Sequence, residues 1–151
     1  MARTVQGIDE IRSLAGQELG ASEWHTITQE QVNAFADLTA DHQYLHVDPE
    51  RAKDSQFGGT IAHGFYTLSL SVGLLDEIVS FGGLSMYLNY GLNKVRFPAP
   101  LPVGSRLRMK AAFADVEDVN GGVQAVVNLT YEIEGAERPP CVAELVLRFL
   151  A

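Results

Sequence analysis

Alternating hydrophobic and polar residues dominate the second half of the chain, from Leu84 onward. β-Branched and aromatic residues are frequent there, and such alternation is typical of strands with one buried face. Turn-forming residues separate the segments at 98–102, 120–122 and 135–140. Because consecutive strands joined by short turns pair antiparallel, the pattern predicts an antiparallel sheet built from four long segments, MYLNYGLNKVRF, SRLRMKAAFADVEDV, GVQAVVNLTYEIEG and CVAELVLRFL.

Helical periodicity marks two segments of the first half. Thr28 followed by Gln31 is a capping-box pattern, and apolar residues recur at helical spacing after it, which predicts a helix over about 29–38. Between 61 and 80, apolar residues lie on nearly every side of the helical wheel, with small Ser, Thr and Gly between them. This composition predicts one long buried helix.

Shorter elements are expected elsewhere. Residues 8–15 have the pattern of a short amphipathic helix, and 23–28 alternate in the manner of a strand. The polar run 41–48 predicts a loop. Pro49 fits the first turn of a short helix that ends near Lys53.

Together these elements predict the class of the fold. One long buried helix with four or five long antiparallel strands gives an α+β domain in which the sheet wraps the helix; a two-layer sandwich of another kind is the alternative. A chain of 151 residues fits a single domain over 1–151. Wrapping leaves an edge strand and part of the helix uncovered, which favours a homodimer that extends the sheet.

Charge and composition narrow the partners and the compartment. The net charge of -8, from 19 acidic and 11 basic residues, argues against nucleic acid, whereas a few local basic residues could still hold the phosphates of coenzyme A. The single Cys141 allows no disulfide within the chain. Neither a signal peptide nor an apolar run of roughly 18 residues is present. We therefore expect a cytoplasmic protein that does not enter the membrane.

Three of the four histidines lie between Asp41 and Gly64, at 42, 46 and 63. A neutral imidazole at His46 can accept a proton, and the Asp41 carboxylate can orient the same water. Such a pair supplies the acid–base groups needed to add water to an activated alkene. The alternatives are that Asp41 caps a turn and that His46 is a surface residue.

Hydration also requires a donor for the carbonyl oxygen that becomes negative. The segment TIAHG (60–64) opens the predicted buried helix, where backbone N–H groups are free. Because Gly64 has no side chain, a thioester oxygen could approach its N–H closely. The alternative is a glycine required only for packing.

Two other kinds of site are weaker interpretations. His42 and His46 stand four residues apart, but the chain has no HExxH motif and no pair of CxxC motifs, so no metal is expected. A lone cysteine such as Cys141 beside an apolar strand is usually a packed small hydrophobe rather than a nucleophile.

The chain resembles the MaoC-like dehydratases, the (R)-specific enoyl-CoA hydratases. The resemblance is carried by DHQYLHVDP (41–49) and FGGTIAHG (57–64), then by NYGLNKVRFP (89–98) and PVG (102–104). The resemblance extends from about Thr28 to the C-terminus. More specifically, the chain resembles the single-domain branch known as nodulation protein N-like.

This resemblance implies a hot-dog fold, a dimer and reversible syn hydration of trans-2-enoyl-CoA to (R)-3-hydroxyacyl-CoA. It implies that Asp41 and His46 bind the catalytic water and that the Gly64 N–H binds the thioester oxygen. No metal or redox cofactor is needed, and coenzyme A belongs to the substrate. Two departures are Gln43-Tyr44 in place of Asn-Pro and Val72 in place of a supporting serine.

Substrate contacts are expected from His63 and Phe65, beside an acyl tunnel between the long helix and the sheet, which Leu68 and Leu74 would also line. Lys94 and Arg96 are candidates for the coenzyme A phosphates, across a dimer interface. Core packing and solvated strand charges are the respective alternatives. The competing functions are a thioesterase, a dehydratase acting on acyl carrier protein, and a non-catalytic acyl-CoA-binding subunit.

Overall fold

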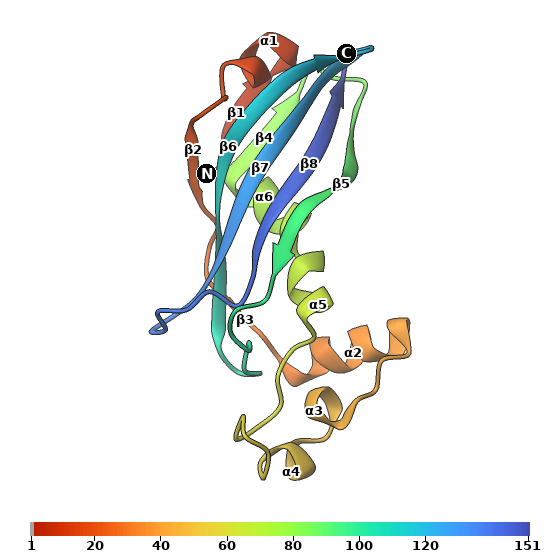
Figure 1. Ribbon diagram of the computed structural model, residues 1–151, viewed down its shortest axis with the longest axis vertical. Helices are drawn as coiled ribbons and strands as arrows, with labels where there is room; N and C mark the ends of the chain where they lie inside the picture. Colours follow the sequence, from red (N-terminus) through yellow and green to blue (C-terminus); the bar gives the residue numbers. More distant parts are fainter. Residues whose placement is uncertain (1) are drawn as a thin grey trace.

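A curved antiparallel sheet forms the body of the molecule (Figure 1), and the computed structural model describes residues 2–151. The strand order is β2-β6-β7-β8-β5, and β3 pairs with β6 beside β2. Its strands are β2 Glu18–Ala21, β3 His25–Thr26, β5 Met86–Arg96, β6 Arg106–Val119, β7 Gly122–Ile133 and β8 Val142–Leu150. The four long segments that the sequence predicted are therefore β5 to β8, and their antiparallel pairing is confirmed.

Alternation of side chains gives this sheet one buried face. On β6 the inward residues Leu107, Met109 and Phe113 are at most 1% exposed, while their neighbours along the strand reach solvent. Strand β7 repeats the pattern with Val123, Ala125, Val127, Leu129 and Tyr131. The concave face therefore carries the hydrophobic core.

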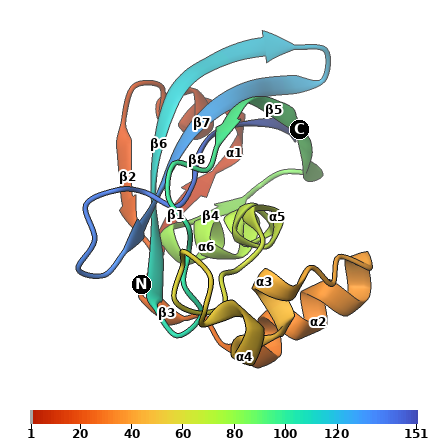
Figure 2. The ribbon, with the colours of Figure 1, turned by 60° about the horizontal axis from the view of Figure 1, so that its bottom comes forward.

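The helix that the sheet wraps lies against this face (Figure 2), as the α+β prediction requires. It consists of α5 Gly64–Ser69 and α6 Ser71–Ile78, joined by Leu70 with φ -75° and ψ -9°. Leu74, Leu75 and Ile78 of α6 belong to the same core cluster as the strands.

The predicted helix over 61–80 was too long at both ends. Ile61 forms a bridge with Pro102, and the N–H of Ala62 donates to the carbonyl of Leu101 at 2.8 Å. At the other end Val79–Gly82 is strand β4, which pairs in parallel with β1 Arg3–Gln6. At both ends, the backbone groups that a longer helix would need are hydrogen-bonded to segments distant in the sequence.

The remaining helices are short, apart from α2 Gln29–Thr39. Both hydrogen bonds of the predicted capping box are present between Thr28 and Gln31. Of the predicted strand over 23–28, only β3 forms, and the predicted N-terminal helix is α1 Gly7–Arg12. Pro49 begins α4 Pro49–Ala52 as predicted, and the Asp48 carboxylate accepts from the Arg51 N–H at 3.1 Å.

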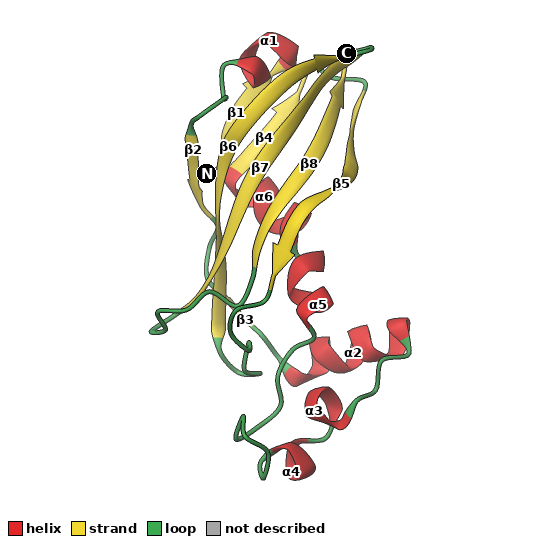
Figure 3. Ribbon diagram, viewed as in Figure 1, coloured by secondary structure: helices red, strands yellow, loops and turns green. Residues whose placement is uncertain are grey.

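The segment 41–48 is not wholly a loop, because Tyr44–Val47 forms one turn of helix, α3. Its backbone is closed by the N–H of Asp48, which donates to the Tyr44 carbonyl at 3.0 Å. Helices α2, α3 and α4 gather at one end of the sheet, next to the start of α5 (Figure 3). This end of the molecule brings the motif residues together.

Among residues 2–151, strand β5 pairs with β8 alone, so its other edge has no partner in this part of the chain. Large apolar side chains stand exposed along it, namely Met86, Leu88, Tyr90 and Leu92, with Phe97 just beyond its end. An open strand edge with apolar side chains is a site for pairing with another chain. Within residues 2–151, no helix combines the length and the hydropathy needed to span a membrane.

Candidate active site

His46 is held by polar contacts inside the cluster of short helices. The residue is 9% exposed, and its carbonyl accepts from the Gln29 amide at 2.6 Å. Gln29 lies in the first turn of α2 and accepts in turn from the Thr60 hydroxyl at 2.6 Å. These bonds join α2, α3 and the segment before α5, so the position of His46 depends on all three.

One hydrogen bond fixes which ring nitrogen of His46 is free. Nδ1 lies 2.8 Å from the carbonyl oxygen of Ile61. Because a carbonyl only accepts, Nδ1 carries the proton and Nε2 keeps its lone pair. No hydrogen bond among residues 2–151 uses Nε2, so this nitrogen is available to accept a proton from a water molecule.

Asp41 follows directly on the end of α2. The helix ends at Ala40 in the left-handed conformation, with φ 60° and ψ 22°, which turns the chain sharply before Asp41. The Asp41 carboxylate is exposed, and one oxygen accepts a long bond of 3.5 Å from the Gln43 N–H. It therefore retains acceptor capacity for a water.

His63 completes the cluster. Asp41, His46 and His63 each offer one ligand atom, and the three atoms lie within 4.8 Å of one another. One water that makes two hydrogen bonds of about 2.8 Å can bridge groups at such a separation. The predicted pair, Asp41 and His46, is therefore close enough for one water to contact both side chains.

The geometry of the two histidine rings does not suit a metal ion held by all three residues. The rings of His46 and His63 are stacked, with centroids 3.8 Å apart and planes inclined by 25°. A zinc ion lies at about 2.0–2.1 Å from nitrogen along its lone pair, which points in the ring plane. Two nearly parallel rings cannot both direct lone pairs at one ion, so this arrangement does not fit a shared metal.

Gly64 lies in the same cavity as His46. This cavity, of about 340 Å³, is also lined by Ile61, Ala62, Thr67 and Phe97. Gly64 is the first residue of α5, and none of the hydrogen bonds of residues 2–151 uses its N–H. An imidazole and a residue with a free amide N–H therefore line one cavity, whereas Asp41 does not line it.

The structure separates the other predicted substrate contacts. His63 is 3% exposed, whereas Phe65 is 70% exposed and lines a neighbouring hollow together with Leu68 and Val72. Leu74 lies in the core and borders a cleft on another face of the helix. Lys94 and Arg96 are exposed on β5 and line none of these cavities. Val72, at the position where the resemblance implies a supporting serine, lines the hollow beside Phe65, and the neighbouring Ser71 is buried at 7% exposure.

Three residues of the site were missed by sequence reasoning. Thr67, one turn after Gly64, is 1% exposed and lines the cavity. Phe97 packs its ring on Gly64, so closely that an added Cβ there would lie 3.0 Å from the ring. Gln29 supports His46 from α2. The spacing of Thr67 from Gly64 was a usable signal, whereas nothing local indicated the contacts of Phe97 and Gln29.

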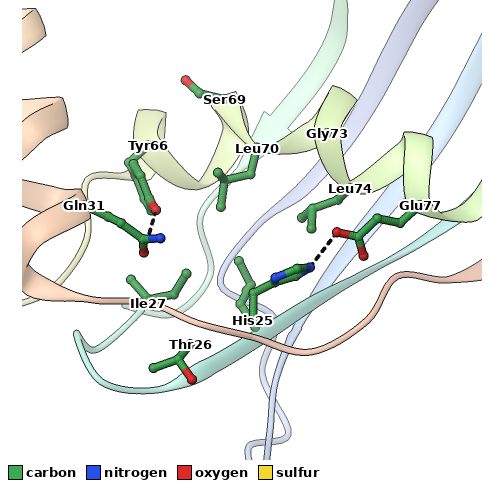
Figure 4. Close-up of a pocket in the computed structure, with 11 residues that line it drawn as sticks. His25, Thr26, Ile27, Gln31, Tyr66, Ser69, Leu70, Gly73, Leu74 and Glu77 are labelled. Carbon is green, nitrogen blue, oxygen red and sulfur yellow. Dashed lines mark hydrogen bonds and ion pairs between the residues drawn. The ribbon is translucent and has the colours of Figure 1, made fainter.

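A second cleft, of about 320 Å³, lies on another face of α5 and α6 (Figure 4). His25 Nε2 lies 2.6 Å from a carboxylate oxygen of Glu77 at one end, and the Tyr66 hydroxyl donates to Gln31 at 3.3 Å at the other. Burial raises the pKa of Tyr66, so the phenol remains a donor. Asp41, His46 and Gly64 do not line this cleft, which is therefore distinct from the candidate active site.

Comparison with known proteins gives a consistent picture. The model of the MaoC like domain matches residues 10–135. The chain is 53% identical over 150 residues to the 3-hydroxyacyl-thioester dehydratase Z of Mycobacterium tuberculosis, with 99% of each chain covered. It is 42% identical over 142 residues to the nodulation protein N of Rhizobium meliloti, covering 92% of this chain and 88% of that protein.

Solved structures share the fold. A monoamine oxidase regulatory protein from Archaeoglobus superposes with a TM-score of 0.82 at 27% identity, covering 99% of this chain and 97% of that one. The (R)-hydratase from A. caviae gives a TM-score of 0.73 at 23% identity, with 88% and 94% covered. These neighbours confirm the hot-dog fold, and the family match and the relatives place the chain in the MaoC-like domain family, a family of hydro-lyases that hydrate and dehydrate acyl thioesters.

Proposed function

We propose that this protein is an (R)-specific enoyl-CoA hydratase, which adds water reversibly to trans-2-enoyl-CoA to give (R)-3-hydroxyacyl-CoA. One observation carries the proposal: His46 and Gly64 line the same cavity, and a ring nitrogen of His46 lies within 4.8 Å of a carboxylate oxygen of Asp41. The 53% identity to a protein named for 3-hydroxyacyl-thioester dehydration supports the same chemistry.

The residues divide the reaction between them. Asp41 accepts a hydrogen bond from the water and orients it, and His46 Nε2 takes one of its protons as the oxygen attacks C3 of the enoyl group. The electron pair of the double bond moves toward the thioester oxygen, which accepts a hydrogen bond from the N–H of Gly64. His46 then returns the proton to C2 on the same face, so the addition is syn and all atoms balance.

Binding of the substrate is proposed for residues around this centre. Phe65 borders the hollow next to the cavity, between α5 and β5, and would contact the acyl chain. Lys94 and Arg96 would meet the phosphates of coenzyme A from β5. That His63 contacts the substrate stays a prediction, and its burial at 3% exposure favours an indirect role. No metal or redox cofactor enters the proposed reaction, and a cytoplasmic location also stays a prediction.

A homodimer is part of the proposal. The unpaired edge of β5 and its exposed apolar side chains favour a second copy of this chain as the partner. Pairing would also cover Phe65 and Phe97 beside the active-site cavity. Light scattering on a sizing column should give twice the chain mass, and Leu88→Arg should shift the protein to monomer with reduced activity. A wild-type monomer at micromolar concentration would contradict this part.

The activity is tested by mixing the protein with crotonyl-CoA and a longer enoyl-CoA and following the loss of the enoyl thioester absorbance. Asp41→Asn and His46→Gln should each lower the rate by about 10²–10⁴-fold. Asp37→Asn, an exposed carboxylate on α2, is the matched control and should retain the activity. Wild-type protein without hydration, or with hydration that survives both changes, would refute the proposal.

Three related measurements separate the competing functions. Release of free thiol, detected with a disulfide dye, would indicate a thioesterase. Faster turnover of the same acyl group on acyl carrier protein would indicate a dehydratase of that carrier. Binding of acyl-CoA without turnover would indicate a non-catalytic subunit.

A further inference from the structure

We infer that His63 is a positioning residue, which holds the backbone of Asp41 in place through its Nε2–H and thereby aligns the catalytic carboxylate with His46. This inference rests on the proposed hydratase function for its kinetic consequences. Its structural basis is independent of the substrate.

The hydrogen bond to Asp41 fixes the tautomer of His63. Nε2 lies 3.0 Å from the carbonyl oxygen of Asp41, and this oxygen can only accept, so the ring carries its proton on Nε2. Nδ1 is buried and has no hydrogen-bond partner among the described residues. The opposite tautomer would direct a lone pair at the carbonyl and bury an N–H without an acceptor, which is unfavourable at both atoms.

The same hydrogen bond restrains the main chain of Asp41. Asp41 follows Ala40, whose left-handed backbone is uncommon for a residue other than glycine. The Asp41 side chain is exposed, and its bond from Gln43 is long at 3.5 Å. His63 instead fixes the main chain of Asp41 to the residue before α5, across 22 residues of sequence.

Neighbouring rings hold the His63 ring in its position. It stacks on His46 at 3.8 Å, and the ring of Phe35 lies 5.0 Å away. At 3% exposure the ring cannot swing into the cavity without displacing these neighbours. One side chain therefore contacts both members of the catalytic pair, one by a hydrogen bond and the other by its face.

His63 links the two parts of the proposed catalytic centre. His63 precedes Gly64, the proposed oxyanion donor. The hydrogen bond from His63 to Asp41 thus links the residue whose carboxylate orients the water to the residue before Gly64, whose N–H donates to the thioester oxygen. Loss of the bond frees Asp41 to move, and a displacement of about 1 Å can lower a rate by about 10²-fold.

Two variants isolate the hydrogen bond. His63→Phe keeps the size and the stacking of the ring but has no donor, and we expect kcat to fall by about 10²-fold with KM changed by less than about 3-fold. The amide nitrogen of His63→Gln can take the place of Nε2, so this variant should recover at least about 10-fold of the loss. The matched control is His25→Phe, at the half-exposed hydrogen bond to Glu77 in the second cleft. Equal kcat in the Phe and Gln variants, or a loss carried by KM, would overturn the inference.

The coupling to Asp41 is tested in the same assay. In an Asp41→Asn background, His63→Phe should lower kcat by much less than about 10²-fold, because the group that it positions is already absent. A full, additive loss would show that His63 acts independently of Asp41 and would overturn the inference.

A measurement without turnover covers the case in which a variant fails to fold. Two-bond ¹H–¹⁵N correlation spectra of the wild-type protein should show His63 as the Nε2–H tautomer. A proton on Nδ1 in place of Nε2 would overturn the inference whatever the enzyme catalyses. Conversely, the Nε2–H tautomer in a protein without hydratase activity would retain the geometry and refute only the proposed function.

Discussion

Gly64→Ala tests the proposed oxyanion site most directly, because the structure allows its effects on stability and on activity to be separated. Gly64 does not have a positive φ, so alanine is compatible with the backbone. A Cβ placed there would meet three ring atoms of Phe97 at 3.0–3.1 Å. Phe97 is 43% exposed and lies just after the end of β5, so its ring has room to move by a few tenths of an ångström.

The expected change in stability is therefore small. Alanine favours a helix over glycine by up to about 1 kcal/mol, and displacement of the half-exposed Phe97 ring opposes this by a similar amount. Thermal unfolding should change by no more than a few degrees. Activity should respond differently, because the methyl group would occupy the approach to the Gly64 N–H, and loss of one oxyanion donor lowers the rate by about 10²–10³-fold.

The assay is hydration of crotonyl-CoA, measured beside thermal melting of the same samples. Phe97→Ala is the companion variant, since it removes the ring without adding a methyl group at Gly64. If Gly64→Ala acts only by moving Phe97, both variants should lose the same activity. Wild-type kcat/KM in Gly64→Ala would refute the role of this amide.

Three further predictions concern stability. Thr28→Ala removes the side-chain cap of α2 and should lower the free energy of unfolding in urea by about 1 kcal/mol, with an unchanged value contradicting the capping role. Tyr131→Phe removes a buried hydroxyl without a hydrogen-bond partner and should leave that free energy equal or higher by up to about 1 kcal/mol, so a clear loss would reveal a hidden partner. Burial raises the pKa of the Cys141 thiol from 9.0 to about 11, so the folded state holds this proton more tightly than the unfolded chain. The stability that results is complete below pH 9 and lost as the pH rises toward 11, and Cys141→Ala should flatten this part of the pH profile of urea unfolding.

The sequence by itself determined the elements whose signals are local. Alternation in four consecutive segments gave β5 to β8, and the capping box of Thr28 gave the start of α2. These predictions succeeded because side-chain period and cap chemistry act within a few residues. The motif residues Asp41, His46 and Gly64 were identified in the same way, from neighbours in the chain and from the resemblance that they carry.

Only the tertiary structure decided where the buried helix begins and ends. Pairing of Ile61 with Pro102 excludes the first residues, and pairing of β4 with β1 excludes the last. Apolar residues fit a buried strand as well as a buried helix, so their composition could not distinguish the two. The segments that pair with the two ends of this region, at Pro102 and in β1, lie far away in the sequence.

The chemistry of the site depends on the same kind of distant contact. The carbonyl of Ile61 fixes the proton on Nδ1 of His46, and the carbonyl of Asp41 fixes the proton on Nε2 of His63. Neither bond joins residues close in sequence, and no local pattern encodes a tautomer. The sequence determined which side chains are present, whereas folding determined which nitrogen of each ring is free, because a ring takes its proton to the atom that faces an acceptor.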